Sequence, residues 1–176
     1  MQTSATPTSR RRFLRSSLSI LAMTGLGHSQ FGMAAIQAET VTVWKTPTCG
    51  CCKDWVIHMR KEGFNVVTND VPDTAPMRQK LGLPAKFGSC HTAQVGGYVI
   101  EGHVPASEVK RLLREKPAAI GLAVPGMPVG SPGMEIPGEM LGVRDAFDVV
   151  LVTRDGSSRV YESYAAKTAT KSRIKS

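Results

Sequence analysis

The sequence predicts a single α/β domain that follows an export signal. Short β-rich runs alternate with segments whose apolar residues recur at helical spacing, and glycine or proline separates most of these elements. Of the 176 residues, the 138 that follow residue 38 suit one domain. We expect the signal over 1–38, the domain over 39–166 and a basic, disordered tail over 167–176.

The first strand and helix are predicted from residues 42–62. Residues 42–44 are β-rich, and apolar residues then recur every three or four positions over 51–62. Thr48 is placed to cap the N-terminus of this helix, and Gly63 to end it. Three aromatic or apolar residues in and after the helix are assigned to the core: Trp55, Met59 and Phe64.

The next elements follow at short intervals and complete a recognisable order. They are a strand over 64–68, a short helix over 75–81, strands over 92–95 and 98–101 joined by Gly96-Gly97, and a helix over 105–115. The order strand, helix, strand, helix, strand, strand, helix is that of a thioredoxin-like fold. In that fold the loop before the third strand comes close to the start of the first helix.

The C-terminal part of the domain has a different composition. Residues 117–138 contain five prolines and five glycines and show no regular period, so disorder is one interpretation. The larger apolar side chains among them, such as Ile120, Leu122 and Val124, favour an ordered Gly/Pro/Met-rich loop that lies over the domain. Strands over 147–153 and 159–164, around Asp155-Gly156, predict a C-terminal β-hairpin extension.

The first 38 residues have the form of a twin-arginine export signal. Ser9-Arg10-Arg11-Arg12-Phe13-Leu14 precedes an apolar run over 18–26, which is shorter than the ~20 residues of a membrane span. Small residues between 33 and 38 offer cleavage sites. We therefore expect a periplasmic protein with no membrane span after cleavage, and a basic unstructured N-terminus is the alternative.

The net charge of +8 comes from the two ends of the chain. Four of the 22 basic residues lie within 1–38 and four more lie from Lys167 onward, which leaves 14 basic against 14 acidic residues in between. Nucleic-acid binding requires a basic patch on the domain itself, so we expect no nucleic-acid partner.

Four cysteines carry the chemistry of the chain. Three form Cys49-Gly50-Cys51-Cys52 at the start of the first helix, and the fourth, Cys90, precedes His91 in the loop that the fold brings close. A buried structural cysteine behaves as a small hydrophobe and needs no cysteine neighbours. The cluster therefore indicates either disulfide exchange or the binding of soft metal ions.

Four convergent thiolates favour copper as Cu(I), with Zn(II) as a competitor. Thiolate sulfur can bridge two ions, so the site could hold a multinuclear thiolate-bridged cluster. Imidazole and thioether groups also suit copper, and the further candidate ligands are His91, His103, Met127 and Met134. Structural histidines and loop-anchoring methionines are the alternatives. His58 lies roughly 10 Å further down the helix and is not expected to bind.

Two rival functions remain open. Cys49 and Cys52 form a C-x-x-C pair at a helix N-terminus, where the dipole lowers a thiol pKa, as in a thiol–disulfide oxidoreductase. That mechanism has no use for Cys51. A structural zinc module is the third hypothesis. The sequence has no G-x-S-x-G, P-loop or H-E-x-x-H motif. It therefore gives no support for a serine hydrolase, a P-loop nucleotide-binding protein or a zinc metalloprotease.

Four motifs over residues 41–136 resemble one bacterial family. They are VWKTPTCGCCK (43–53), GSCHT (88–92), EGHVP (101–105) and GLAVPGMP (121–128). The family was long known only as a domain of unknown function, and it includes the copper-resistance proteins called CopG.

This resemblance implies a thioredoxin-like fold and copper binding in the periplasm, alongside copper efflux or chaperone proteins. It also implies that Cys49, Cys51, Cys52 and Cys90 bind copper, with His91 or His103 as an additional ligand. It leaves storage, transfer and Cu(I)/Cu(II) interconversion open.

Overall fold

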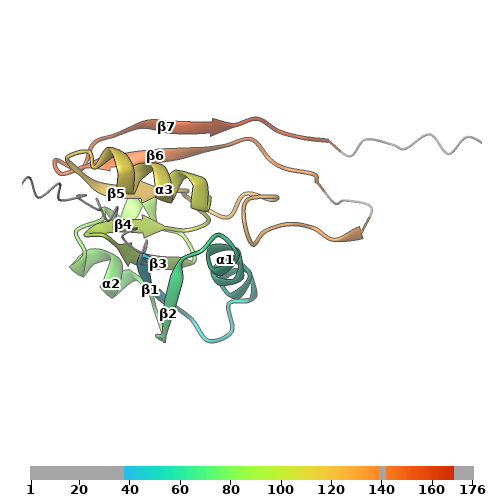
Figure 1. The fold of residues 1–176 in the computed structure, drawn as a ribbon, viewed down its shortest axis with the longest axis horizontal. Coiled ribbons are helices and arrows are strands. Elements are labelled where there is room, and N and C mark those ends of the chain that lie inside the picture. Colours follow the sequence, from blue (N-terminus) through green and yellow to red (C-terminus); the bar gives the residue numbers. More distant parts are fainter. Residues whose placement is uncertain (1–37, 139–141, 169–176) are drawn as a thin grey trace, which may run out of the picture. The chain divides into compact units, whose positions relative to one another are not determined.

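A seven-stranded sheet with the order β2-β1-β3-β4-β5-β6-β7 organises the computed structural model, which describes residues 38–138 and 142–168 (Figure 1). The elements are β1 (Thr40–Lys45), α1 (Gly50–Lys61), β2 (Asn65–Asp70), α2 (Ala75–Lys80), the 3-10 turn η1 (Ala85–Phe87), β3 (His91–Val95), β4 (Tyr98–Glu101), α3 (Ala106–Glu115), β5 (Ala119–Ala123), β6 (Phe147–Thr153) and β7 (Ser158–Tyr164). The β1–β2 and β4–β5 pairs are parallel and the others are antiparallel. The predicted α/β class is confirmed, whereas the thioredoxin-like assignment stays a prediction.

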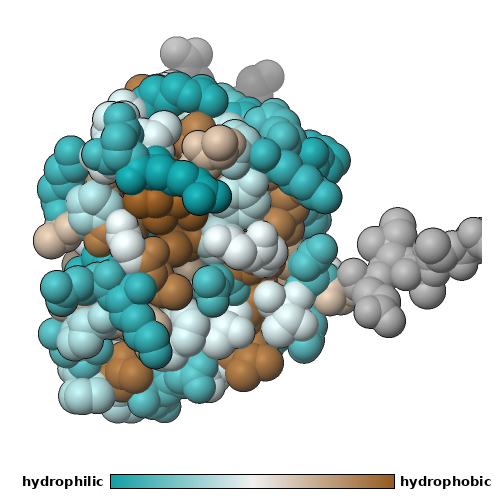
Figure 2. All heavy atoms as spheres, turned by 90° about the vertical axis from the view of Figure 1, so that its left-hand side faces the viewer, coloured by the Kyte–Doolittle hydropathy of each residue, from teal (hydrophilic) through white to brown (hydrophobic). Residues whose placement is uncertain are grey.

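The two faces of the sheet bury different apolar sets, because successive side chains of a strand point to opposite faces. Helices α1 and α3 cover one face, where Trp55, Met59 and Leu112 pack against strand residues such as Val43 and Ile100. The predicted core positions Trp55, Met59 and Phe64 all belong to this cluster. A smaller cluster on the other face packs Leu83 and Phe87 against Val99, Ala123 and Val152. On the face in Figure 2, hydrophilic residues form most of the surface and apolar ones emerge between them.

Helix α1 begins one residue earlier than predicted, and its cap is Cys49, not Thr48. Cys49 has an extended backbone (φ −69°, ψ 100°), and its sulfur accepts a hydrogen bond from the Cys52 N–H at 3.3 Å. The sulfur thus takes the place that the threonine hydroxyl was predicted to take. At the other end, Gly63 adopts a left-handed conformation (φ 92°) just beyond the helix, as the sequence predicts.

Strand β5 is the main difference from the sequence prediction, which treated 117–138 as a loop without strands. Residues 119–123 pair in parallel with β4 on one side and antiparallel with β6 on the other. At Gly121 a Cβ atom would lie 1.7 Å from the Val99 carbonyl oxygen, so only glycine allows this close approach. β5 therefore joins the predicted C-terminal hairpin, β6 and β7, to the main sheet.

Helix α3 holds the hairpin onto the domain. Arg111 pairs with Glu162 at 2.7 Å, and its guanidinium stacks on the Tyr161 ring at 3.7 Å. Lys167, the first residue of the predicted tail, still pairs with Arg144 through its backbone. The rest of the tail from 169 and the predicted signal up to 37 lie outside the described residues, and no helix within the described ranges is long and apolar enough to cross a membrane.

The Gly121→Ala variant tests the close approach of β5 to β4. We expect it to lower the free energy of unfolding by more than about 2 kcal/mol, because the new methyl group must displace the Val99 backbone. Urea unfolding measures the change. The matched control is Gly50→Ala, where a Cβ meets nothing within 4 Å, and its free energy of unfolding should stay within about 1 kcal/mol of the parent. Equal effects of the two substitutions would contradict the packing argument.

Candidate metal centre

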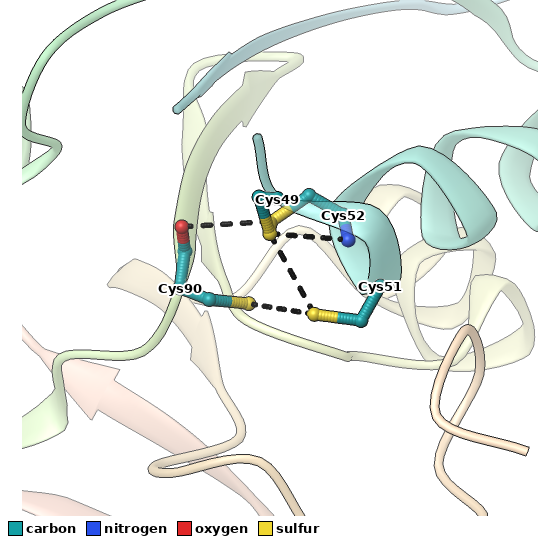
Figure 3. Close-up of side chains that lie close together, drawn as sticks. All are labelled: Cys49, Cys51, Cys52 and Cys90. Carbon is teal, nitrogen blue, oxygen red and sulfur yellow. Dashed lines mark hydrogen bonds between the residues drawn. A yellow bond between two sulfur atoms is a disulfide. The ribbon is translucent and has the colours of Figure 1, made fainter. Parts of the chain in front are cut away.

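The candidate site lies where the N-terminus of α1 meets the start of β3 and the residues after β4 (Figure 3). Cys49, Cys51 and Cys52 come from the first turn of α1, and Cys90 comes from the loop that ends at β3. The sulfurs of these four residues all lie within 4.8 Å of one another. The convergence predicted from the sequence is therefore present.

Cys49 and Cys52 are joined by a disulfide, and Cys51 and Cys90 are free thiols. The Cys51 sulfur lies 3.6 Å from the Cys49 sulfur and 3.9 Å from the Cys90 sulfur, and Figure 3 shows the Cys51 and Cys90 side chains pointing toward one another. Cys52 is fully buried, whereas Cys51 and Cys90 are partly exposed. The sulfurs thus form one contiguous group that is partly exposed to solvent.

Burial and the neighbouring Cys51 sulfur raise the pKa of the Cys90 thiol to about 12. A thiol with this pKa keeps its proton near neutral pH. A bound metal cation would displace the proton, because the thiolate and not the thiol is the ligand. The surroundings of Cys90 therefore favour a thiolate bound to a metal cation over a free thiolate.

Two buried imidazoles adjoin Cys90. Its sulfur lies 3.0 Å from His103 Nε2 and 3.3 Å from His91 Nδ1. His103 Nδ1 lies 2.8 Å from the Pro132 carbonyl oxygen, which can only accept, so Nδ1 carries the proton and Nε2 directs its lone pair at the sulfur. A backbone carbonyl that orients a histidine in this way is typical of metal sites.

Burial disfavours the protonated form of both histidines. Burial lowers the pKa of His91 to about 3, with a smaller contribution from His103, and burial also lowers the pKa of His103. The His91 ring packs against Trp55 with 4.4 Å between centroids, and its Nε2 has no hydrogen-bond partner among the described residues. Two neutral imidazoles beside Cys90 are suited to a metal ion, because they add donors without adding positive charge.

The two predicted methionine ligands belong to segments that border the site. Ser89 donates its hydroxyl proton to the Gly126 carbonyl oxygen, so the segment before Met127 contacts the residue before Cys90, and Met127 itself is 55% exposed. Gly133, just before the half-buried Met134, packs so closely on α1 that a Cβ would lie 2.7 Å from the Cys51 carbonyl oxygen. The loop segments at Gly126 and Gly133 thus border the site, and ligation by either methionine stays a prediction.

His58 makes a structural contact between two helices. Its Nε2 accepts a hydrogen bond from the Ala106 N–H at 3.1 Å, which links α1 to the start of α3.

Sequence reasoning missed a buried ion pair next to the cysteines. Glu101 is fully buried and accepts hydrogen bonds from Arg78 at 2.8 Å and from the Ser89 N–H at 2.7 Å. Burial raises the pKa of the Glu101 carboxyl, while hydrogen bonds from Thr92, Ser89 and Arg78 oppose that rise. The available signal was a glutamate at the end of an apolar strand, which does not reveal its partner.

Comparisons with known proteins agree with this geometry. A family model described as "Protein of unknown function, DUF411" matches residues 87–134. A solved structure titled "Copper resistance protein copG, Form 1" is 42% identical, with a TM-score of 0.68, and the match covers 74% of this chain and 100% of that one. The Form 2 structure is also 42% identical, with a TM-score of 0.67 and coverage of 73% and 99%. No curated protein matches the chain.

The pH dependence of stability tests the neutral state of His91. In the metal-free protein the free energy of unfolding should fall as the pH is lowered from 6.5 towards 3. The unfolded chain takes up a proton at the ordinary pKa of 6.5, whereas folded His91 takes it up only near 3. Burial also lowers the pKa values of His58 and His103, so these residues also make the free energy of unfolding fall as the pH is lowered.

Urea unfolding at a series of pH values isolates the contribution of His91 to the pH dependence of the free energy of unfolding. The His91→Gln variant should lose less stability over this window than the parent, because glutamine does not titrate. Parallel curves for the two proteins would contradict the assignment.

Proposed function

The chain belongs to the CopG family of copper resistance proteins, and from this membership and the site geometry we propose that it is a periplasmic protein that protects against excess copper by binding Cu(I). In its reduced form, the thiolates of Cys49, Cys51, Cys52 and Cys90 bind the metal. The observation that carries the proposal is the convergence of the four sulfurs within 4.8 Å.

The position of Cys90 favours copper over zinc. A single zinc ion bound by four thiolates is complete at four ligands. It would leave two buried imidazoles, 3.0 and 3.3 Å from the Cys90 sulfur, without a role. Thiolates that bridge several Cu(I) ions would use both donor sets, because Cys90 is shared between the cysteine group and the histidine pair. We therefore propose a multinuclear, thiolate-bridged copper cluster.

The Gly/Pro/Met-rich loop has a protective role in this proposal. Its segments contact Ser89 and the first turn of α1, so they shield the cluster from one side. Met127 and Met134 supply thioethers in these segments, and copper efflux or chaperone proteins of the periplasm would be the partners that exchange copper with the site. Export through the predicted twin-arginine signal at 9–14 would carry the protein to that compartment.

A thiol–disulfide oxidoreductase is the second candidate, and the Cys49–Cys52 disulfide favours it. The pair stands at the N-terminus of α1, where the Cys52 N–H contacts the Cys49 sulfur and would stabilise a thiolate after reduction. This function gives no role to Cys51, Cys90 or the two histidines.

Anaerobic titration of reduced mature protein with Cu(I), in competition with a Cu(I) chelator, tests the main proposal. We expect tight uptake of more than one copper ion per chain. Replacing all four cysteines with serine should abolish uptake, whereas the control His58→Gln should bind as the parent does. Absence of uptake by the reduced parent would overturn the proposal, and tetrahedral zinc in the protein as isolated would favour a structural module.

The Cys51→Ser variant separates the two candidate functions. If copper is the cargo, this variant should bind fewer Cu(I) ions per chain while the Cys49–Cys52 disulfide still forms. Reduction of a disulfide-containing peptide, followed by thiol titration, measures the rival activity. Full activity of both the parent and Cys51→Ser on that peptide, with unchanged copper binding, would favour the oxidoreductase.

A further inference from the structure

Cys90 is the one site cysteine that α1 does not carry, so its position depends on the loop before β3. Three polar groups of the preceding residue, Ser89, are anchored. Its N–H donates to Glu101 Oε1 at 2.7 Å, its carbonyl oxygen accepts from Arg78 Nη2 at 3.0 Å, and its hydroxyl donates to the Gly126 carbonyl oxygen. The side chains of Arg78 and Glu101, which form a buried ion pair, therefore hold both the N–H and the carbonyl group of Ser89.

The ion pair that holds Ser89 is buried, and both carboxylate oxygens of Glu101 accept hydrogen bonds. Arg78 Nε lies 2.8 Å from Glu101 Oε1, and the other carboxylate oxygen of Glu101 accepts from the Thr92 hydroxyl at 2.7 Å. Arg78 also donates to the Thr74 hydroxyl at 3.1 Å. The pair links α2 to the end of β4, and it contacts Ser89 from both of these elements.

Two glycines let the chain close around Ser89. A Cβ at Gly88 would lie 2.9 Å from the Arg78 guanidinium nitrogen Nη1. A Cβ at Gly102, which has φ +69°, would lie 2.5 Å from the Ser89 hydroxyl oxygen. The loop thus packs against the ion pair with no room for additional side-chain atoms, and Ser89 has little freedom to move.

Stability alone is a weak reason for such a pair. Replacing a buried ion pair with apolar residues of similar volume is often neutral or stabilising. The hydrogen bonds to Ser89, in contrast, are lost in any apolar replacement. The distinctive contribution of the pair is therefore its hold on the backbone of Ser89, the residue before Cys90.

We infer that Arg78 and Glu101 are positioning residues for copper binding, which hold Ser89 so that the Cys90 sulfur faces Cys51, His91 and His103 before the metal arrives. This inference rests on the proposed binding of Cu(I) by the four cysteines. The sulfur then keeps its distances of 3.9, 3.3 and 3.0 Å to those three partners without a rearrangement of the loop. Preorganised ligands bind more tightly because less conformational freedom is lost on binding.

The test uses the double variant Arg78→Met/Glu101→Leu, which replaces the pair with apolar side chains. We expect the double variant to stay folded, with a urea midpoint at most modestly below that of the parent because the Ser89 N–H loses its acceptor, while its affinity for Cu(I), measured against a chelator, falls about 10- to 100-fold. The ultraviolet absorption of Cu(I)-thiolate bonds per bound copper should fall toward that of Cys90→Ser. A double variant that binds Cu(I) as tightly as the parent, with the same absorption, would overturn the inference.

Two single variants keep the test decisive if the double variant does not fold. Arg78→Lys retains the charge but lacks the planar fork that reaches Glu101 and the Ser89 carbonyl together, so it should weaken Cu(I) binding. Glu101→Gln keeps an acceptor for the Ser89 N–H and should bind nearly as the parent does. Parent-like affinity in Arg78→Lys would overturn the inference, and so would equal losses in both single variants.

A matched control is the exposed ion pair between Lys110 and Glu62, on α3 and after α1. Replacing both residues with glutamine should leave Cu(I) affinity unchanged, since neither contacts the loop that carries Cys90. If the parent itself does not bind Cu(I), the proposed function fails. If the parent binds and the Arg78 variants bind equally well, only the positioning role fails.

Discussion

The site depends above all on the antiparallel pairing of β1 with β3. Its register ends at the pair Lys45–His91, so the chain that leaves β1 and the chain that enters β3 lie at the same edge of the sheet. The first of these continues into the turn of α1 that carries three cysteines, and the second brings Cys90 immediately before His91. One ladder of backbone hydrogen bonds therefore brings together sulfurs that lie about forty positions apart in the sequence.

The chemistry of the site follows from what surrounds Cys90. Its thiol is partly buried and lies beside another sulfur, a combination that disfavours a free thiolate. Its other neighbours are imidazoles whose pKa values are lowered by burial. The environment thus offers sulfur and imidazole donors close together, a set that suits a soft cation. Cys49 and Cys52 are joined by a disulfide, so these two sulfurs would be available to a metal ion as thiolates only after reduction.

Local signals in the sequence predicted the elements whose patterns are local. The helical spacing of Trp55 and Met59 lies within a few residues, and so does the Gly96-Gly97 turn. The helix and the hairpin that these patterns predict are both present. Strand β5 was missed for two reasons. Its partner β4 is separated from it in the sequence by α3, and the glycine and proline residues around it are typical of a loop. The Arg78–Glu101 pair was missed for the same reason, since 23 positions separate its partners and neither residue type predicts burial.

The loop that borders the candidate metal centre connects β5 to β6, and these two strands are neighbours in the sheet. A connection that leaves and returns at adjacent strands can be lengthened, shortened or rewritten without any change in strand order. The scaffold that positions the cysteines and the segment that covers them are therefore separable in evolution. Relatives could acquire different metal preferences or different partners by exchanging this one connection, while the sheet beneath it stays the same.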